Sequence, residues 1–179
     1  TGGSVMGNVT VQTLDYTAYN TAVTVDLEGK TATGIGSTWN GITTLKGSSN
    51  SDTLIGANVV NTWNITGSNL GDIDGTFFFS NVENIKGGTA ADTFTGGADG
   101  LITGALTDPA GMTTLNSNIT AGSANFTGDV VLGSDSTINT SNAGGNIAFN
   151  STLDGTQTLG LTAGMGDITF IGAVGTTPL

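Results

Sequence analysis

A repeat with an offset of about 40 residues constrains this chain more than any other feature, because such periods are typical of solenoid architectures. Residues 42–56 read ITTLKGSSNSDTLIG, and residues 82–96 read VENIKGGTAADTFTG. The offset keeps apolar, Lys, Gly and Asp positions in step, pairing Ile42 with Val82, Leu45 with Ile85, Lys46 with Lys86, Gly47 with Gly87, Asp52 with Asp92, and Leu54 with Phe94. We therefore expect residues 1–100 to contain two copies of one structural unit.

The second half of the chain has short apolar triplets at a closer spacing. They are Val130-Val131-Leu132, Ile138-Asn139-Thr140, Ile147-Ala148-Phe149, Leu159-Gly160-Leu161 and Ile168-Thr169-Phe170. The same 21-residue spacing separates Ile138 from Leu159 and Ile147 from Ile168. Short strands that return about every 20 residues predict an all-β parallel β-helix (β-solenoid), whose coils stack roughly 4.8 Å apart. In that fold one 40-residue repeat corresponds to two coils, and a β-sandwich is the alternative.

The composition favours strands and turns, and it excludes two classes of partner. There are 30 Gly residues, and charged residues make up only 9% of the chain, so strong helix formers are scarce. Lys30, Lys46 and Lys86 face 14 acidic residues, which gives a formal net charge of −11. Binding to nucleic acids or to anionic membranes needs a surplus of cationic side chains, so we expect neither.

The chain also lacks the residues on which most catalytic sites depend. It contains no His and no Cys, so its Ser and Thr hydroxyls have no usual base and no disulfide can form. Asp72 and Asp74 would share one face of a strand, where they could serve a carbohydrate-active β-helix enzyme or bind Ca²⁺. The other interpretation of these two residues is a turn with acids facing the solvent. We expect no enzymatic activity, with the carbohydrate-active enzyme kept as an alternative.

Several stretches resemble families of very large exported bacterial proteins. The chain resembles a repeat of giant exported proteins at residues 14–19, 23–27, 32–34 and 47–56. It resembles filamentous-haemagglutinin-like adhesins at residues 128–132, 161–164 and 172–175. These resemblances cover most of the chain. They imply a right-handed parallel β-helix in which residues 101–179 form haemagglutinin-like coils continuous with the first part. They also imply a protein that is secreted or lies on the bacterial outer surface.

A further resemblance concerns calcium. The segments Gly47–Ile55 and Gly87–Thr95 are similar to the calcium-binding nonapeptide of RTX (haemolysin-type) proteins, which implies that Asp52 and Asp92 are metal ligands. The pattern is degenerate, since Ser48 replaces the second Gly of one copy and the two copies are not in tandem. Calcium prefers about six to eight oxygen ligands. The alternative is that both carboxylates cap turns through side-chain hydrogen bonds.

Together these observations predict a structural or adhesive module of a large secreted or surface-exposed bacterial protein. A calcium-dependent RTX-like folding module is the alternative, and Ca²⁺ is the one cofactor that the sequence suggests. The chain starts at Thr1 and not at Met, so we expect a segment that lacks its own signal peptide. The expected partners are neighbouring repeats of the same chain, host or cell-surface glycans or proteins, and further copies joined end to end.

Overall fold

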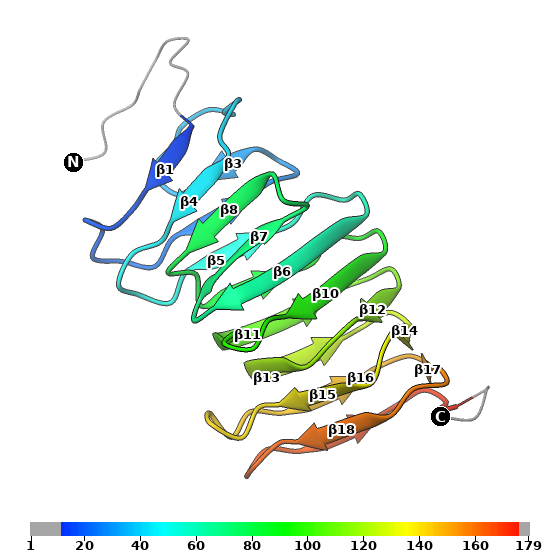
Figure 1. Cartoon of the computed structure of the whole chain (residues 1–179). Coiled ribbons are helices and arrows are strands. Elements are labelled where there is room, and N and C mark those ends of the chain that lie inside the picture. Colours follow the sequence, from blue (N-terminus) through cyan, green and yellow to red (C-terminus); the bar gives the residue numbers. More distant parts are fainter. Residues whose placement is uncertain (1–11, 176–179) are drawn as a thin grey trace.

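The computed structural model describes residues 12–175, which form strands and turns and contain no helix. Nineteen strands, most of them three or four residues long, are arranged in two sheets that run the length of the molecule (Figure 1). The predicted all-β class is confirmed. This part of the chain accordingly offers no helix of the length and apolar character that a membrane crossing needs.

We call the two sheets sheet 1 and sheet 2. The strand order below starts near the N-terminal end of the molecule for sheet 1 and near the C-terminal end for sheet 2. Sheet 1 has the spatial order β1 (Thr13–Asp15), β4 (Thr44–Lys46), β8 (Phe77–Ser80), β7 (Leu70–Ile73), β6 (Asn61–Gly67), β10 (Asp92–Gly96), β12 (Thr113–Leu115), β14 (Val130–Leu132) and β17 (Leu153–Asp154). Sheet 2 has the order β18 (Leu159–Thr162), β15 (Ser136–Asn139), β13 (Ile119–Phe126), β11 (Ile102–Asp108), β9 (Asn84–Lys86), β5 (Thr53–Ile55), β2 (Thr24–Asp26) and β3 (Thr31–Ala32). A branch continues from β13, with β16 (Ile147–Phe149) beside β13 and β19 (Ile168–Phe170) beside β16.

Most neighbouring strands are parallel and belong to successive passages of the chain through the same sheet. Each strand from β9 to β16 pairs with one that follows about 20 residues later, a typical length for one solenoid coil. Ile147 pairs with Ile168, as their spacing predicts. Ile138 pairs with Leu161, two residues beyond the expected Leu159. Because side chains alternate with a period of two, this shift leaves every residue on the face that the pattern predicts.

Two antiparallel elements interrupt the parallel order, and the repeat pattern of the sequence predicts neither. β2 and β3 form one, and the meander β6–β7–β8 forms the other, in which β7 lies between its two neighbours (Figure 1). The turn from β7 to β8 contains Asp74 and Gly75, both with positive φ. Asp-Gly is a favoured pair for tight hairpin turns, because both positions of such a turn need this conformation. The sheets are therefore mixed and not purely parallel.

The two copies of the 40-residue repeat lie in opposite sheets. β4 belongs to sheet 1, whereas its repeat counterpart β9 belongs to sheet 2, and the same exchange relates β5 and β10. Within sheet 2, Leu54 pairs with Ile85, whereas its repeat counterpart Phe94 lies in sheet 1. A shift by two coils would return each strand to its own sheet, so the expected equivalence of one repeat with two coils is wrong. The repeated motif instead builds a crossing from sheet 1 to sheet 2 and a second crossing back.

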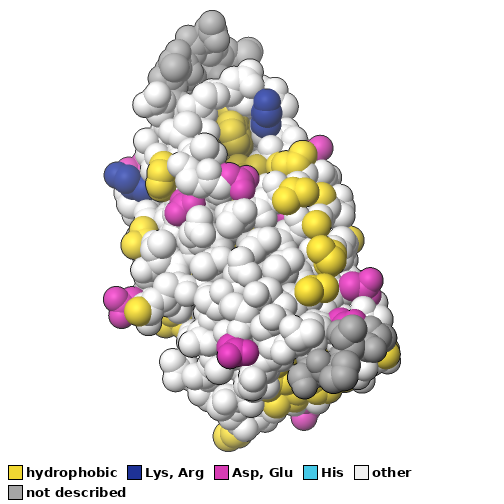
Figure 2. Space-filling view, turned by 45° about the vertical axis from the view of Figure 1, so that its right-hand side comes forward, with side chains coloured by type: hydrophobic (Ala, Val, Ile, Leu, Met, Phe, Trp, Pro, Cys, Tyr) yellow, Lys and Arg dark blue, Asp and Glu magenta, His cyan; other side chains and the backbone are white. Residues whose placement is uncertain are grey.

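The core lies between the sheets and is built from side chains that stack in register. Phe126 and Phe149 have ring centroids 5.4 Å apart, and Phe149 and Phe170 have centroids 5.2 Å apart. Trp63 and Phe94 make a similar stacked pair at 6.0 Å. Parallel pairing places each aromatic residue above its counterpart on the next strand, where each ring pair adds about 0.5–1.5 kcal/mol beyond the area it buries. The face in Figure 2 shows mostly neutral polar side chains and backbone, together with several groups of hydrophobic side chains, scattered Asp and Glu, and few Lys.

Candidate functional site

Asp52 lies at the crossing from β4 to β5 and is fully buried. Its carboxylate accepts hydrogen bonds from the backbone N–H of Ser48 and from the Ser48 hydroxyl at 3.0 Å, which closes the turn. It also accepts one from the backbone N–H of Val23 at 2.8 Å, next to the preceding strand of sheet 2. The carboxylate therefore joins its own turn to the neighbouring passage of the chain.

Asp92 repeats this arrangement at the crossing from β9 to β10. Only 1% of its surface is exposed. The carboxylate accepts hydrogen bonds from the Gly88 N–H at 2.8 Å, from the Asn61 N–H at 3.1 Å and from the Asn61 side-chain amide at 2.8 Å. Burial raises the pKa of Asp92 above its usual value, although these donors act in the opposite direction.

The glycine that starts each repeated turn makes room for the carboxylate that ends it. A Cβ on Gly47 would lie 2.6 Å from an Asp52 oxygen and would overlap the Asn81 carbonyl oxygen. A Cβ on Gly87 would lie 2.6 Å from an Asp92 oxygen. These separations are shorter than ordinary contacts between nonbonded atoms. The Gly and Asp positions that the repeat keeps in step are thus the two halves of one corner motif.

The structure does not bring Asp52 and Asp92 together, because they occupy different crossings. Their oxygens accept hydrogen bonds from N–H groups and, at Asp52, a hydroxyl, which are donors and not ligands for a cation. Residues 12–175 hold no group of three or more His, Cys, Asp and Glu side chains that could share a metal ion. Calcium sites in proteins usually assemble about six to eight oxygen ligands. The geometry accordingly agrees with the alternative interpretation of the repeat, in which the two carboxylates cap turns through side-chain hydrogen bonds.

The structure adds Asp108, a third buried carboxylate, which lies outside the repeated motif of the sequence. It is fully buried at the end of β11, where the Thr113 hydroxyl donates a hydrogen bond of 2.6 Å to its Oδ2. Its Oδ1 has no hydrogen-bond partner among the described residues. This oxygen and one Asp92 oxygen each lie 2.6 Å from the position of a Cβ on Gly87. Burial raises the pKa of Asp108 to about 6, and the nearby Asp92 carboxylate adds to the effect.

The protonation of Asp108 predicts a stability that falls as the pH rises. Between about pH 4 and pH 6 the folded state retains a proton on Asp108 that the unfolded state releases, so the free energy of unfolding decreases by up to roughly 3 kcal/mol. The variant Asp108→Asn cannot ionise, so it should lose the part of the pH dependence that Asp108 contributes and be more stable than wild type at pH 7. The part that the raised pKa of Asp92 contributes should remain. Urea unfolding at pH 4.5 and pH 7.5 measures the difference.

A charge-matched control separates this effect from the loss of one negative charge. Asp99→Asn removes a charge from an exposed turn and should retain the pH dependence of wild type. The pKa values of the exposed Asp15 and Asp129 are lowered by hydrogen bonds, so their stabilising effect is lost only below the pH window of Asp108. A wild-type chain that is equally stable at pH 4.5 and pH 7.5 would contradict the assignment.

Further Asn and Asp side chains connect successive passages of the chain, and no motif of the sequence distinguishes them. Each accepts a hydrogen bond from a backbone N–H on the following passage: Asn84 from Ala105 at 3.0 Å, Asn118 from Thr137 at 2.9 Å, Asp135 from Thr158 at 2.7 Å, and Asn146 from Asp167 at 2.8 Å. Short polar side chains commonly satisfy backbone groups in turns. Part of the high Asn and Asp content therefore serves to hold the corners of the stack together.

Asp72 and Asp74 do not form the pair of strand residues on one face that the alternation predicts. Asp72 lies in β7, whereas Asp74 lies in the following turn with a φ of 54°. The Asp72 carboxylate accepts hydrogen bonds from the Asn64 amide at 2.9 Å and the Gly75 N–H at 2.8 Å. The Asp74 carboxylate accepts one from the Thr62 N–H at 2.7 Å. The interpretation as a turn with acidic residues describes Asp74, whereas Asp72 is a strand residue whose carboxylate accepts a hydrogen bond from that turn.

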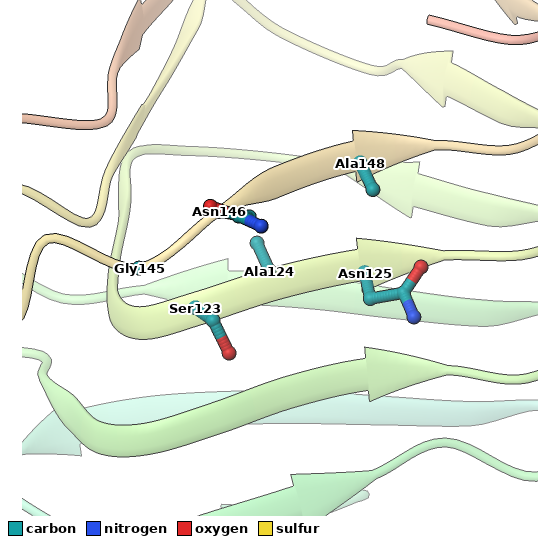
Figure 3. Close-up of a pocket in the computed structure, with 6 residues that line it drawn as sticks. All are labelled: Ser123, Ala124, Asn125, Gly145, Asn146 and Ala148. Carbon is teal, nitrogen blue, oxygen red and sulfur yellow. The ribbon is translucent and has the colours of Figure 1, made fainter. Parts of the chain in front are cut away.

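A shallow hollow of about 440 Å³ lies between β13 and the start of β16 (Figure 3). Its lining consists of short, uncharged residues, namely Ser123, Ala124, Asn125, Gly145, Asn146 and Ala148. The Oδ1 atom of Asn146 already accepts the Asp167 N–H, and that of Asn125 accepts the Asn150 amide at 2.7 Å. This lining offers no acid or base, so the hollow is suited to weak polar contacts and not to proton transfer.

Comparison with known proteins adds no relative to this description. No family model, no curated protein and no solved structure matches the chain.

Proposed function

We propose that the chain is a right-handed parallel β-solenoid that serves as a structural and adhesive module of a large secreted or surface-exposed bacterial protein. The observation that carries this proposal is the parallel pairing at intervals of about 20 residues, which recurs in both sheets from β9 to β19. Parallel strands joined by crossovers are right-handed in about 98% of known cases, which supports the handedness. The stack of the buried Phe126 and Phe149 with the partly exposed Phe170 joins successive coils through their aromatic rings.

The adhesive part of the proposal rests on surface chemistry. The outer positions of the strands carry mainly Thr, Asn, Ser and Gly, whose neutral groups can exchange hydrogen bonds with a polar surface. The excess of acidic residues keeps such a chain soluble without attracting nucleic acids. Export to the cell surface and end-to-end contact with further copies belong to the same proposal, and they agree with the resemblance to haemagglutinin-like adhesins.

Removal of one whole coil is the test of the solenoid. Thr113 and Val130 occupy equivalent register positions, so deletion of residues 113–129 connects Met112 to Val130 and should preserve both sheets. We expect an unchanged strand signal in circular dichroism and cooperative unfolding at a slightly lower temperature. The control deletion of residues 113–121 removes about half of a coil and should abolish the cooperative transition. Equal damage by both deletions would count against the solenoid.

A further inference from the structure

The antiparallel meander β6–β7–β8 carries an apolar patch on the outer face of sheet 1. Phe78 is 50% exposed and Leu70 is 45% exposed, whereas Phe77 and Phe79 beside Phe78 point inward and are buried. Among the described strands, only β7, β8 and β19 at the end of the stack expose a large hydrophobic side chain. An exposed Phe or Leu side chain cannot form hydrogen bonds with water as Thr or Asn does. Adjacent exposed apolar side chains therefore indicate a binding site.

Polar groups surround this patch in a regular arrangement set by the strand register. Phe78 lies between Thr44 on β4 and Asp72 on β7, and Ser80 lies between Lys46 on β4 and Leu70 on β7. The side chains enclose a shallow groove of about 300 Å³, lined by Thr44, Lys46, Leu70, Asp72, Phe78 and Ser80 together with neighbouring residues. The groove thus combines one exposed aromatic ring with a carboxylate, an ammonium and the hydroxyl groups of Thr44, Thr66 and Ser80.

We propose that this groove binds one pyranose ring of a neutral glycan. The face of an aromatic ring is electron-rich, so the Phe78 ring can support the C–H face of a sugar. The hydroxyl groups at the rim of the sugar then meet Asp72 as acceptor, Lys46 as donor, and Ser80 and Thr44 as either. This inference rests on the proposed adhesive function and gives that function a contact surface.

The charges and the size of the groove favour a neutral sugar over other ligands. Lys46 is paired with Asp15, whose carboxylate oxygen lies 3.5 Å from the Lys46 Nζ, so the positive charge is largely compensated. The remaining Asp72 would repel an acidic sugar. The volume lies at the small end of ligand sites, which corresponds to a single ring of a longer glycan.

A peptide or protein fits this surface less well. A peptide usually joins a sheet by pairing with a free strand edge, and β7 is hydrogen-bonded to β6 on one side and to β8 on the other (Figure 1). A stable protein partner needs a contact area above roughly 1,000 Å², with several apolar anchors. The patch offers two such anchors, Leu70 and Phe78, so recognition of a small ring is the better match.

The experiment compares wild type with Phe78→Thr, which keeps a strand-forming residue at the position. Val131→Thr is the matched control, because Val131 is a half-buried residue in the middle of β14 in the same sheet. Each chain is titrated with maltotriose, cellotriose, chitotriose and the acidic trisaccharide sialyllactose while side-chain NMR signals are recorded. We expect at least one neutral trisaccharide to shift the Phe78 and Leu70 signals. Phe78→Thr should weaken that binding by roughly tenfold or more, and Val131→Thr should bind like wild type.

Three results would overturn the site: no shift with any neutral trisaccharide, equal binding by wild type and Phe78→Thr, or tighter binding of sialyllactose. Adhesion of the immobilised chains to surfaces coated with the same sugars separates the site from the proposed function. Equal adhesion of wild type and Phe78→Thr overturns the site and leaves an adhesive module standing. Sugar binding in the groove without adhesion supports the site and overturns the adhesive role.

Discussion

Replacement of Phe149 with Ala is expected to lower the free energy of unfolding by about 3–5 kcal/mol. Phe149 is the middle ring of three, 5.4 Å from Phe126 and 5.2 Å from Phe170, and only 1% of it is exposed. Truncation therefore removes two ring contacts and leaves a cavity that the short strands on either side cannot fill. The melting temperature should fall by about 10 °C or more.

Phe170→Ala provides the matched control for this prediction. Phe170 has the same register position on the neighbouring strand β19, but it has a ring neighbour on one side only and is 42% exposed. Its truncation should cost roughly 1 kcal/mol, because less surface is buried and water can fill the space. Thermal unfolding of both variants, followed by circular dichroism, measures the difference. Equal losses would show that the ring stack does not support the interior as described.

The second large effect is expected at the corner motif. Gly47→Ala drives a Cβ into the Asn81 carbonyl oxygen, which belongs to the backbone and cannot rotate away. The turn must open, and the hydrogen bonds of Asp52 to Ser48 and Val23 weaken with it. We expect a loss of about 3 kcal/mol or more in the free energy of unfolding.

Two further glycines calibrate this result. Gly36 has no atom within 4 Å of the position of a Cβ, so Gly36→Ala should be neutral or stabilise slightly. At Gly87 the closest atoms are carboxylate oxygens at 2.6 Å, which can move, so Gly87→Ala should cost less than Gly47→Ala. Urea unfolding of the three variants gives the order. If Gly36→Ala were as damaging as Gly47→Ala, loss of backbone freedom and not the corner contact would be the cause.

The sequence predicts the positions of the strands better than it predicts which residues of neighbouring strands pair. The triplets that start at Ile138, Ile147 and Ile168 lie in or overlap β15, β16 and β19, because short alternating segments between turn residues signal strands locally. Pairing depends on how many residues each turn consumes, and that number varies from one passage to the next. For this reason the 21-residue spacing identifies the partner of Ile147 but misses that of Ile138 by two residues.

The residues of the candidate site likewise fall into those that the sequence predicts and those that only the structure reveals. The repeat singles out Asp52 and Asp92, and their shared corner geometry explains why it keeps Gly and Asp in step. Asp108 has no counterpart in the repeat, and its burial depends on β11 placing it on the same inward face as Leu106. The alternation of Leu106 and Asp108 was the one local signal for an inward carboxylate. The groove at Phe78 was hidden because three consecutive Phe residues do not reveal which of them faces outward.

The corner carboxylates also impose an order on folding. The N–H of Val23 is satisfied by Asp52, 29 residues later, and the N–H of Asn61 by Asp92, 31 residues later. The backbone hydrogen bonds of each passage are therefore complete only after the next corner carboxylate is in place. None of these bonds depends on residues at the far end of the chain. Because both separations are close to 30 residues, the loop-closure cost is similar for these two passages. A chain that emerges slowly, from a ribosome or through a membrane pore, can thus fold progressively from its N-terminal end and expose about one unfinished passage at a time.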